Sequence, residues 1–443
     1  MTEPAWVEHA LFWQVYPLGF VGAESIALSQ GDPAIHRIPA IAAWLDYLVE
    51  LGASGLLLGP VFESSTHGYD TVDYLTIDRR LGDGDDFEAL VSEAHRRGVR
   101  VLLDGVFNHV GRDFPVFQQA LLEGPTSPAA EWFRIFWPPS ADGEPDYEHF
   151  EGHRQLVTLN HACPEVVDFV VDVMAHWLDQ GADGWRLDAA YAVPAGFWAQ
   201  VLPRVRARHP DAYFVGEVIH GDYSAYVAES GLDSLTQYEL WKAIWSSLKD
   251  RNFFELDWTL TRHNDLLESF VPLTFLGNHD VTRIASTLAD ERHLAHAVVL
   301  LLTLGGTPCI YSGDEQGFIG IKEDREGGDA AVRPAFPGTP DALSELGRPV
   351  LALYQQLIGT RRRHPWLHRA RTRVAHLANA QLVYTVHAED DSMVVALNLD
   401  DSAVTVPVPP CGTVLAGAGE VSASGDAMAL PAHGWAVLSA EPQ

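Results

Sequence analysis

Two acidic residues each follow a short, mostly apolar segment. Asp188 follows Gly-Trp-Arg-Leu at residues 184–187, and Glu217 follows Tyr-Phe-Val-Gly at residues 213–216. Burying a carboxylate is costly unless the group is paired or used in chemistry. Two such groups at the ends of neighbouring parallel strands, with a helix-length segment between them, indicate a two-carboxylate active site. In such a site one carboxyl acts as nucleophile and the other as acid and base.

Further polar residues recur at the ends of other apolar segments. They are His67, Tyr69, Asp70, Asp104, Asn108, His109, Arg186, Asn278, His279 and Asp280. A cap or a buried hydrogen bond explains any one of them equally well. In a parallel barrel, however, catalytic groups gather at the C-terminal ends of the strands. Four or more polar strand ends in one layer therefore predict a site.

Eight strand-like apolar segments alternate with helix-like stretches and would position these residues. They are residues 11–16, 55–58, 99–106, 184–187, 213–218, 235–238, 273–276 and 309–311. Segments apolar on both faces are typical of parallel strands covered by helices. Residues 87–97 and 164–180 show the helical spacing of apolar side chains. The pattern predicts an α/β fold, a (β/α)₈ TIM barrel.

Two further regions do not fit a simple barrel. Roughly 75 residues separate the third and fourth expected strands, which is more than a loop and a helix need. Short alternating segments at residues 381–387, 392–399, 404–408 and 436–439 predict an antiparallel β-sandwich. We expect the catalytic barrel in two parts, residues 1–107 and 161–365, an inserted subdomain B at 108–160, and a C-terminal β-sandwich domain at 366–443.

The composition narrows the class of partner. The net charge is −31, with 60 acidic and 29 basic residues, which disfavours nucleic acid and anionic membranes and suits a neutral ligand such as a sugar. The three cysteines, Cys163, Cys309 and Cys411, lack the number and spacing of a disulfide framework or a metal site. We see neither a signal peptide nor a membrane-length apolar run, and we expect a cytoplasmic protein.

Four ordered segments carry a resemblance to a known family. They are Asp-Gly-Val-Phe-Asn-His at 104–109, Gly-Trp-Arg-Leu-Asp-Ala at 184–189, Gly-Glu-Val at 216–218 and Phe-Leu-Gly-Asn-His-Asp at 275–280. Residues 67–74 and 306–315 agree with them. In this order and spacing the chain resembles the α-amylase family, glycoside hydrolase family 13, over about residues 11–365.

The resemblance implies a role for each matching residue. Asp188 matches the nucleophile, Glu217 the general acid/base and Asp280 the third carboxylate, which helps bind and distort the sugar. The remaining matches are Arg186, which keeps the nucleophile ionised, His109 and His279, which hydrogen-bond the sugar, Tyr69, which stacks on it, Asp70 beside it, and Asp104, a structural carboxylate.

The residues support these roles independently. Arg186 and Asp188 are two apart on one strand and so share a face, where the guanidinium favours the ionised carboxylate. Glu217 has no basic residue on its own strand, so we expect it to hold the proton that an acid needs.

The sequence departs from the family pattern at a calcium position. Many members place an Asp where this chain has Thr158, and that Asp ligates calcium together with an Asn matching Asn108. Thr158 is a poor ligand for a hard cation. We therefore expect no cofactor and no metal at that position, and expect Asn108 to find a partner within the protein. A calcium site elsewhere stays open, because acidic loops are plentiful.

This departure resembles the cyclomaltodextrinase, neopullulanase and maltogenic amylase group. The first expected strand begins near residue 11, so we expect the dimer-building N-terminal domain of that group to be absent, leaving a monomer or a homodimer of another kind. Tyr191 and His220 follow the second and third signature segments, and the expected insert is rich in aromatic residues. From these we select Tyr191, His220 and Trp137 as candidate sugar contacts.

The resemblance implies a retaining hydrolase of α-1,4-glucosidic bonds in small malto-oligosaccharides, linear or cyclic, with cyclic maltosyl-maltose among the candidates. Two alternatives stay open. A transglycosylase would use the same residues but pass the glycosyl unit to a sugar instead of water. A non-catalytic binding subunit would keep the barrel but lose the carboxylates, and this chain retains Asp188, Glu217 and Asp280.

Overall fold

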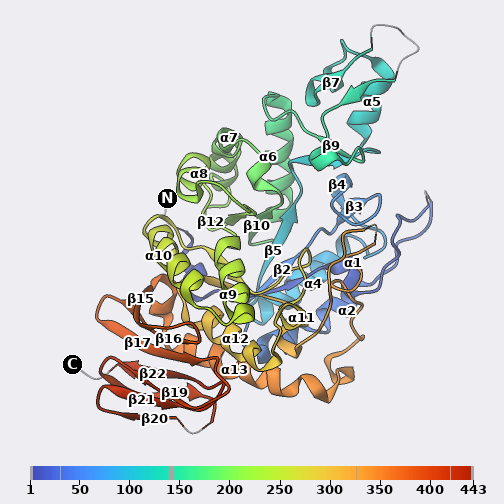
Figure 1. The fold of residues 1–443 in the computed structure, drawn as a ribbon. Coiled ribbons are helices and arrows are strands. Elements are labelled where there is room, and N and C mark those ends of the chain that lie inside the picture. Colours follow the sequence, from blue (N-terminus) through green and yellow to red (C-terminus); the bar gives the residue numbers. More distant parts are fainter. Residues whose placement is uncertain (1–2, 30, 139–143, 326, 420, 441–443) are drawn as a thin grey trace.

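The predicted barrel is present in the computed structural model, which describes all residues except 1–2, 30, 139–143, 326, 420 and 441–443 (Figure 1). Eight parallel strands pair in the order β12-β11-β10-β5-β2-β1-β14-β13. A parallel bridge between Thr236 and Leu273 joins the two outer strands and closes the barrel. The strands are β1 Phe12–Val15, β2 Gly55–Leu58, β5 Arg100–Gly105, β10 Gly184–Leu187, β11 Tyr213–Gly216, β12 Ser234–Leu235, β13 Leu273–Phe275 and β14 Thr307–Tyr311.

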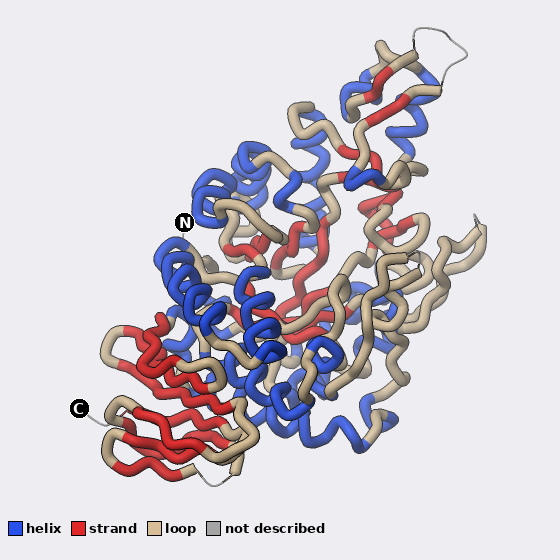
Figure 2. The backbone as a smooth tube through the Cα atoms, viewed as in Figure 1, coloured by secondary structure: helices blue, strands red, loops and turns tan. Residues whose placement is uncertain are grey.

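Helices surround this sheet (Figure 2). The longer ones are α3 Leu45–Leu51, α4 Gly84–Arg96, α6 Pro164–Asp179, α7 Ala195–Arg206, α8 Tyr223–Ser230, α9 Tyr238–Asp250, α10 Phe254–Ser269, α12 Leu294–Thr303 and α13 Arg348–Arg363. The expected helix at 87–97 is α4, which begins at a capping box formed by Asp83 and Asp86. The sixth strand is shorter than expected, because Tyr238 belongs to the first turn of α9 and not to the sheet.

The segment between β5 and α6 projects from the barrel as a separate lobe (Figure 1). It contains α5 Pro115–Glu123 and two antiparallel pairs, β6 His109–Gly111 with β9 Leu156–Thr158, and β7 Ile135–Phe136 with β8 Asp146–Tyr147. The ring of Phe117 packs against those of Phe133 and Tyr147 at centroid distances of 5.0 and 4.9 Å. These aromatic residues thus form a core for the insert. Thr158 lies in β9, opposite His109 of β6.

The C-terminal region forms two antiparallel sheets, ordered β15-β16-β17-β22-β19 and β18-β21-β20. Their strands are β15 Arg371–Leu377, β16 Gln381–Ala388, β17 Asp391–Asn398, β18 Val404–Pro407, β19 Cys411–Gly417, β20 Ser422–Ser424, β21 Ala427–Leu430 and β22 Trp435–Ala440. Val394, Met428 and Leu438 belong to one buried cluster shared by the sheets. The domain packs on the barrel through contacts such as α10 with β15. Among the described residues, no helix is both long and apolar enough to cross a membrane.

Candidate active site

One arginine lies among three carboxyl groups at the C-terminal ends of the central strands. Arg186 of β10 is in register with Asp104 of β5, and its Nη1 lies 2.7 and 2.6 Å from the two Asp104 carboxylate oxygens. The same Nη1 is 3.3 Å from Asp188 Oδ1, and Nη2 is 2.8 Å from Glu217 Oε1. These side chains are at most 10% exposed, so one guanidinium serves three buried carboxyl groups.

This geometry corrects the expectation that Arg186 distinguishes Asp188 from Glu217. Leu187 of β10 pairs with Gly216 of β11, so the two acids that follow them come level on adjacent strands. The long side chain of Arg186 points along the barrel toward both of them. Its nitrogen lies closer to the carboxyl of Glu217 than to that of Asp188. Glu217 therefore has a basic partner, Arg186, although its own strand contains no basic residue.

Three donors contact the carboxyl of Glu217. Besides Arg186, Tyr238 donates its hydroxyl to Oε1 at 2.9 Å, and the backbone N–H of Ala189 donates to Oε2 at 3.1 Å. Asn278 Nδ2 donates to the Tyr238 oxygen at 2.8 Å, which leaves the tyrosine proton for Glu217. Ala189 has a φ of 44°, an unusual backbone conformation that brings its N–H to the glutamate. The position of this carboxyl is thus fixed from three sides.

The electrostatics of the cluster favour a shared proton. Burial raises the pKa of Asp188 well above its ordinary value; Arg186 opposes this rise, and the neighbouring charges of Glu217 and Asp104 add to it. Burial likewise raises the pKa of Asp104 against the effect of Arg186. Because these groups interact strongly, protons bind to them as a set and not to independent residues.

A second set of polar and charged side chains surrounds Asp280. His279 Nε2 lies 2.9 Å from Asp280 Oδ2, and Arg333 Nη2 lies 2.6 Å from Oδ1. Arg333 also donates from Nε to the backbone oxygen of His279 at 2.9 Å, and its guanidinium lies over the ring of Tyr16. Burial would raise the pKa of Asp280, but His279 and Arg333 outweigh it and hold the pKa well below its usual range. Asp280 is therefore ionised at neutral pH.

His109 and Tyr69 form one wall of the site. Asn108 Nδ2 donates to His109 Nδ1 at 3.1 Å, and His109 Nε2 donates to the backbone oxygen of Tyr69 at 3.1 Å. Burial lowers the pKa of His109 to about 3, so its ring is neutral in any ordinary buffer. The ring of Tyr69 is parallel to that of His279 at 5.3 Å, and its hydroxyl donates to Asp104 at 3.1 Å.

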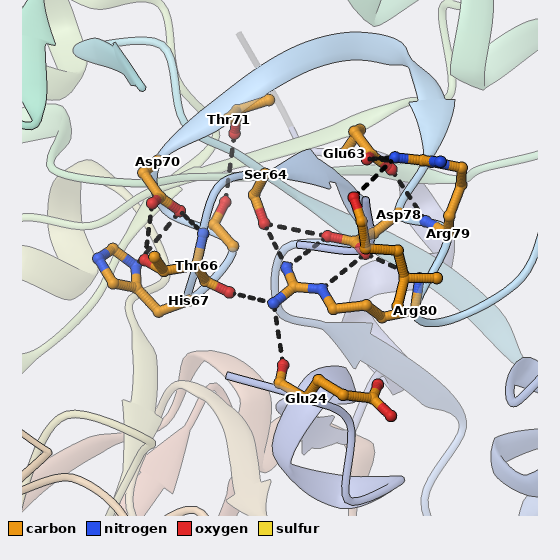
Figure 3. A network of polar contacts seen from close by, with 12 residues as sticks. Glu24, Glu63, Ser64, Thr66, His67, Asp70, Thr71, Asp78, Arg79 and Arg80 are labelled. Carbon is orange, nitrogen blue, oxygen red and sulfur yellow. Dashed lines mark hydrogen bonds and ion pairs between the residues drawn. The ribbon is translucent and has the colours of Figure 1, made fainter. Parts of the chain in front are cut away.

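A buried arginine network fixes the loop that carries Tyr69 (Figure 3). The loop joins β3 Phe62–Ser64 to β4 Thr71–Ile77. Arg80 contacts the side chain of Asp78 at 2.9 and 2.6 Å, and it donates to the side chain of Ser64 at 2.7 Å and to the backbone oxygen of Thr66. Asp70 accepts hydrogen bonds from the backbone N–H and hydroxyl of Thr66 at 3.1 and 2.6 Å. Asp70 therefore stabilises the loop by hydrogen bonds to another residue of the same loop.

The candidate residues open into a cleft of about 620 Å³. Its lining residues are His67, Tyr69, His109, Phe150, Glu151, His153, Leu156, Asp188, Ala189, Tyr191, Glu217, Ile219, Tyr238, Asp280, Val281, Lys322, Gly327, Asp329, Ala330 and Arg333. The cleft lies between the strand ends, the insert and the loop before Arg333. Six of the eleven predicted site residues line it directly: Tyr69, His109, Asp188, Tyr191, Glu217 and Asp280.

The other predicted residues lie behind the cleft or away from it. Arg186 contacts the carboxyl of Glu217 and His279 that of Asp280, and Asp70 forms hydrogen bonds within the loop. His220 lies next to the cleft, with its ring centroid 5.7 Å from that of Tyr191. Trp137 follows β7 in the insert and is not among the residues that line the cleft.

Several lining residues were not selected from the sequence, although Phe150 is one of the insert's aromatic residues. Phe150 stacks on His109 at 4.8 Å, and Glu151 accepts a hydrogen bond from the hydroxyl of Tyr191 at 2.7 Å, which joins the insert to the barrel across the cleft. Tyr238 was expected in a strand, and Arg333 was not selected from the sequence. The three-dimensional path of those loops, which no local pattern records, brings them to the carboxylates.

A (β/α)₈ barrel with three acidic side chains, an arginine and two histidines at its strand ends defines a barrel enzyme of the glycosidase type. The sequence model of the α-amylase catalytic domain matches residues 14–336. A cyclomaltodextrinase from a Bacillus species is 31% identical, over 93% of this chain and 78% of the relative. The intracellular maltogenic amylase of Bacillus subtilis is 32% identical, over 72% of this chain and 57% of the relative.

Among solved structures, the cyclic α-maltosyl-(1→6)-maltose hydrolase of Arthrobacter globiformis superposes with a TM-score of 0.82. It is 27% identical, and the match covers 99% of this chain and 100% of that one. The chain belongs to the α-amylase family and is a glycoside hydrolase.

Proposed function

We propose that the enzyme hydrolyses α-1,4-glucosidic bonds in small linear or cyclic malto-oligosaccharides, with net retention of the anomeric configuration. The observation that carries this proposal is the level placement of Asp188 and Glu217. They follow the paired residues Leu187 and Gly216 on adjacent strands at the base of the cleft. Adjacent strands lie about 4.8 Å apart, close to the roughly 5–5.5 Å between the carboxyl groups of retaining glycosidases.

The proposed reaction has two displacements. In the reacting state the proton shared by the carboxyl cluster is on Glu217, and Asp188 is ionised. Asp188 attacks the anomeric carbon while Glu217 gives this proton to the departing glycosidic oxygen, so the bond breaks and a covalent glycosyl ester forms. Glu217, now a carboxylate, takes a proton from water, whose oxygen displaces Asp188 from the same carbon. The proton taken from water restores the acid form of Glu217, the bond between Asp188 and the sugar is broken, and the sugar leaves with its original α configuration.

The surrounding groups support the binding of one glucosyl unit at this point. Tyr69 offers a fixed aromatic face, and the neutral ring of His109 stands at the same wall. Asp280 is ionised and anchored by His279 and Arg333, so it can accept hydrogen bonds from sugar hydroxyls without being displaced by them. In this proposal these residues bind the glucosyl unit whose bond is broken. No cofactor takes part in either step.

The cleft and the relatives support the proposed substrate class. A cleft of about 620 Å³ is in the range that encloses small ligands. The similar cyclomaltodextrinase, and the cyclic maltosyl-maltose hydrolase that the chain matches over nearly its full length, support short and cyclic glucans as substrates. The name of the Bacillus subtilis relative supports an intracellular location.

The stereochemical test is proton NMR of the first product released from a linear malto-oligosaccharide. The α-anomer should appear first, and initial release of the β-anomer would refute the retaining mechanism. Asp188→Asn should abolish the covalent step, and unchanged hydrolysis by that variant would disprove its role as nucleophile. A panel of linear, cyclic and α-1,6-containing oligosaccharides then defines the substrate. Products longer than the starting sugar would identify a transferase that uses the same residues.

A further inference from the structure

The inserted lobe contributes one acidic side chain to the substrate cleft, and the reaction proposed above does not use it. Glu151 lies in the short helix η3 Phe150–Gly152 and lines the cleft beside its neighbour Phe150. Its carboxylate accepts a hydrogen bond from the hydroxyl of Tyr191 at 2.7 Å. The cleft therefore contains a carboxylate that takes part in neither displacement.

The backbone of Glu151 has an unfavourable conformation. Its φ of 49° and ψ of 33° lie in the left-handed region, which costs free energy for a residue with a long side chain. Such residues persist where the surrounding structure holds them, and they cluster at active sites and ligand-binding positions. Gly152 follows with a φ of 83°, so two successive left-handed residues form the turn that places the carboxylate at the cleft wall.

The carboxylate of Glu151 has no positive partner in the part of the chain that the structure describes. Two arginines near it in the sequence are paired elsewhere, Arg134 with Glu148 and Arg154 with Asp146, at N–O distances of 3.3 and 2.6 Å. The cleft already contains the three reacting carboxyl groups, and like charges repel one another. An ionised carboxylate has about four lone-pair positions, so the group can accept further hydrogen bonds from a ligand.

Tyr191 shows on which side of the reacting bond Glu151 lies. The backbone N–H of Tyr191 donates to the backbone oxygen of Glu217 at 3.2 Å, so the tyrosine lies beside the strand end that carries the acid. Because Glu217 gives its proton to the glycosidic oxygen, the departing sugar has to lie on this side of the cleft. The rings of His109, Phe150 and Tyr191 form a row with centroid separations of 4.8 and 6.3 Å. The row leads from the wall beside the cleaved glucosyl unit to the leaving-group side, where Glu151 meets Tyr191.

We propose that Glu151 is a specificity-determining residue that binds the first glucosyl unit on the leaving-group side of the cleaved bond. The assignment rests on the proposed hydrolysis of malto-oligosaccharides and names the residue that recognises the departing half of the substrate. A hydroxyl of that glucosyl unit donates a hydrogen bond to the carboxylate, which Tyr191 holds in place. Hydrogen bonds to a charged acceptor are about twice as strong as those between neutral groups, so this contact favours a departing sugar over a departing group without hydroxyls.

The test compares two substrates that differ on the leaving-group side. 4-Nitrophenyl α-maltoside, followed by the release of nitrophenol, has no sugar on that side, whereas cleavage of any bond in maltotetraose places one there. Glu151→Gln keeps the shape of the side chain and an oxygen that can accept from Tyr191, but it removes the charge. We expect kcat/KM to fall about tenfold for maltotetraose and about fivefold less than that for the nitrophenyl maltoside.

A second variant removes the contact altogether. Glu151→Gly suits the left-handed backbone, because glycine adopts a φ near 49° without strain, so the variant should fold. Its ratio of kcat/KM for maltotetraose to that for the nitrophenyl maltoside should fall further than in Glu151→Gln, by about 30-fold relative to wild type. The matched control is Glu148→Gln, three residues earlier in the same lobe, because Glu148 pairs with Arg134 and does not line the cleft. This control should keep the wild-type ratio.

The two proposals fail in different ways. If the wild type cleaves neither substrate, the proposed function is wrong. If the wild type cleaves both, that function stands and the variants decide the role of Glu151. Equal losses for the two substrates in Glu151→Gln, an unchanged ratio in Glu151→Gly, or the same shift in the Glu148→Gln control each overturns the inference.

Discussion

Replacing Arg186 by methionine tests whether one guanidinium balances the carboxyl cluster. The side chain contacts Asp104, Asp188 and Glu217 at 2.6, 3.3 and 2.8 Å, and all of these groups are buried. At a separation of about 4 Å such an ion pair represents about 4 kcal/mol at an effective dielectric constant near 20, and it is stronger at shorter distances. Methionine keeps the length and apolar stem of the side chain, so the change removes the charge and little packing.

The loss of unfolding free energy is limited because the carboxyl cluster can take up a proton in place of the guanidinium charge. A carboxyl with an ordinary pKa near 4 costs about 1.4 kcal/mol per pH unit to protonate, which is about 4 kcal/mol at pH 7 and about 1.4 kcal/mol at pH 5. The native variant then binds one more proton than native wild type, while the unfolded states bind equal numbers. The free energy of unfolding of the variant relative to wild type should therefore fall by about 1.4 kcal/mol for each unit of rising pH.

Urea unfolding at pH 5, 6 and 7, followed by tryptophan fluorescence and circular dichroism, measures this slope. The matched control is Arg361→Met. Arg361 is buried but donates only to backbone oxygens, including those of Leu302 and Leu304 at 3.1 and 2.8 Å. Burial lowers its pKa to about 9, above this pH range, so the cost of its loss should not vary with pH. If the loss of unfolding free energy in Arg186→Met does not change with pH, as expected for the control, the charge-balance argument is refuted.

Two further substitutions test how the reacting groups are positioned. Tyr238→Phe removes the hydroxyl that joins Asn278 to Glu217 and leaves a buried amide unpaired. We expect kcat/KM to fall about 10- to 100-fold with little change in KM. Unchanged steady-state kinetics would exclude a role for this bond. Arg80→Met leaves Asp78 buried without its partner and should lower the free energy of unfolding by about 3–5 kcal/mol. It should also lower kcat/KM by about 100-fold, because the loop that carries Tyr69 is displaced. A loss of stability at unaltered kcat/KM would contradict the positioning argument.

The barrel could be predicted because its strands carry an unmistakable local pattern. Each is a short segment that the fold buries on both faces, as in β2 and β11, whose residues are all buried. Spacing along a strand also placed Arg186 and Asp188 on one face, and the order of strands brought His109, Glu217 and Asp280 to the same cleft. Strands β15, β19, β20 and β21 were not predicted, because their exposed edges and Gly- and Ser-containing segments dilute the alternation.

Contacts across loops could not be predicted, and neither could the distribution of charge. Arg333 reaches Asp280 from a stretch with no periodic pattern, and Glu151 reaches Tyr191 from the inserted lobe. Both contacts depend on how a loop of irregular backbone closes over the barrel, which propensities and spacing do not encode.

Strand register explains why the residues of the central cluster were identified correctly while their pairing was not. A side chain's own strand shows which face it occupies, but its partners lie on the neighbouring strands. Arg186 stands opposite Asp104 on one side and two residues below the level of Glu217 on the other, so its charge divides over three strands. Two carboxyl groups that share one arginine, as Asp188 and Glu217 do, cannot be assigned different roles by that arginine. The groups that do differ are Tyr238 and the N–H of Ala189, which contact Glu217, and both reach it from outside its strand.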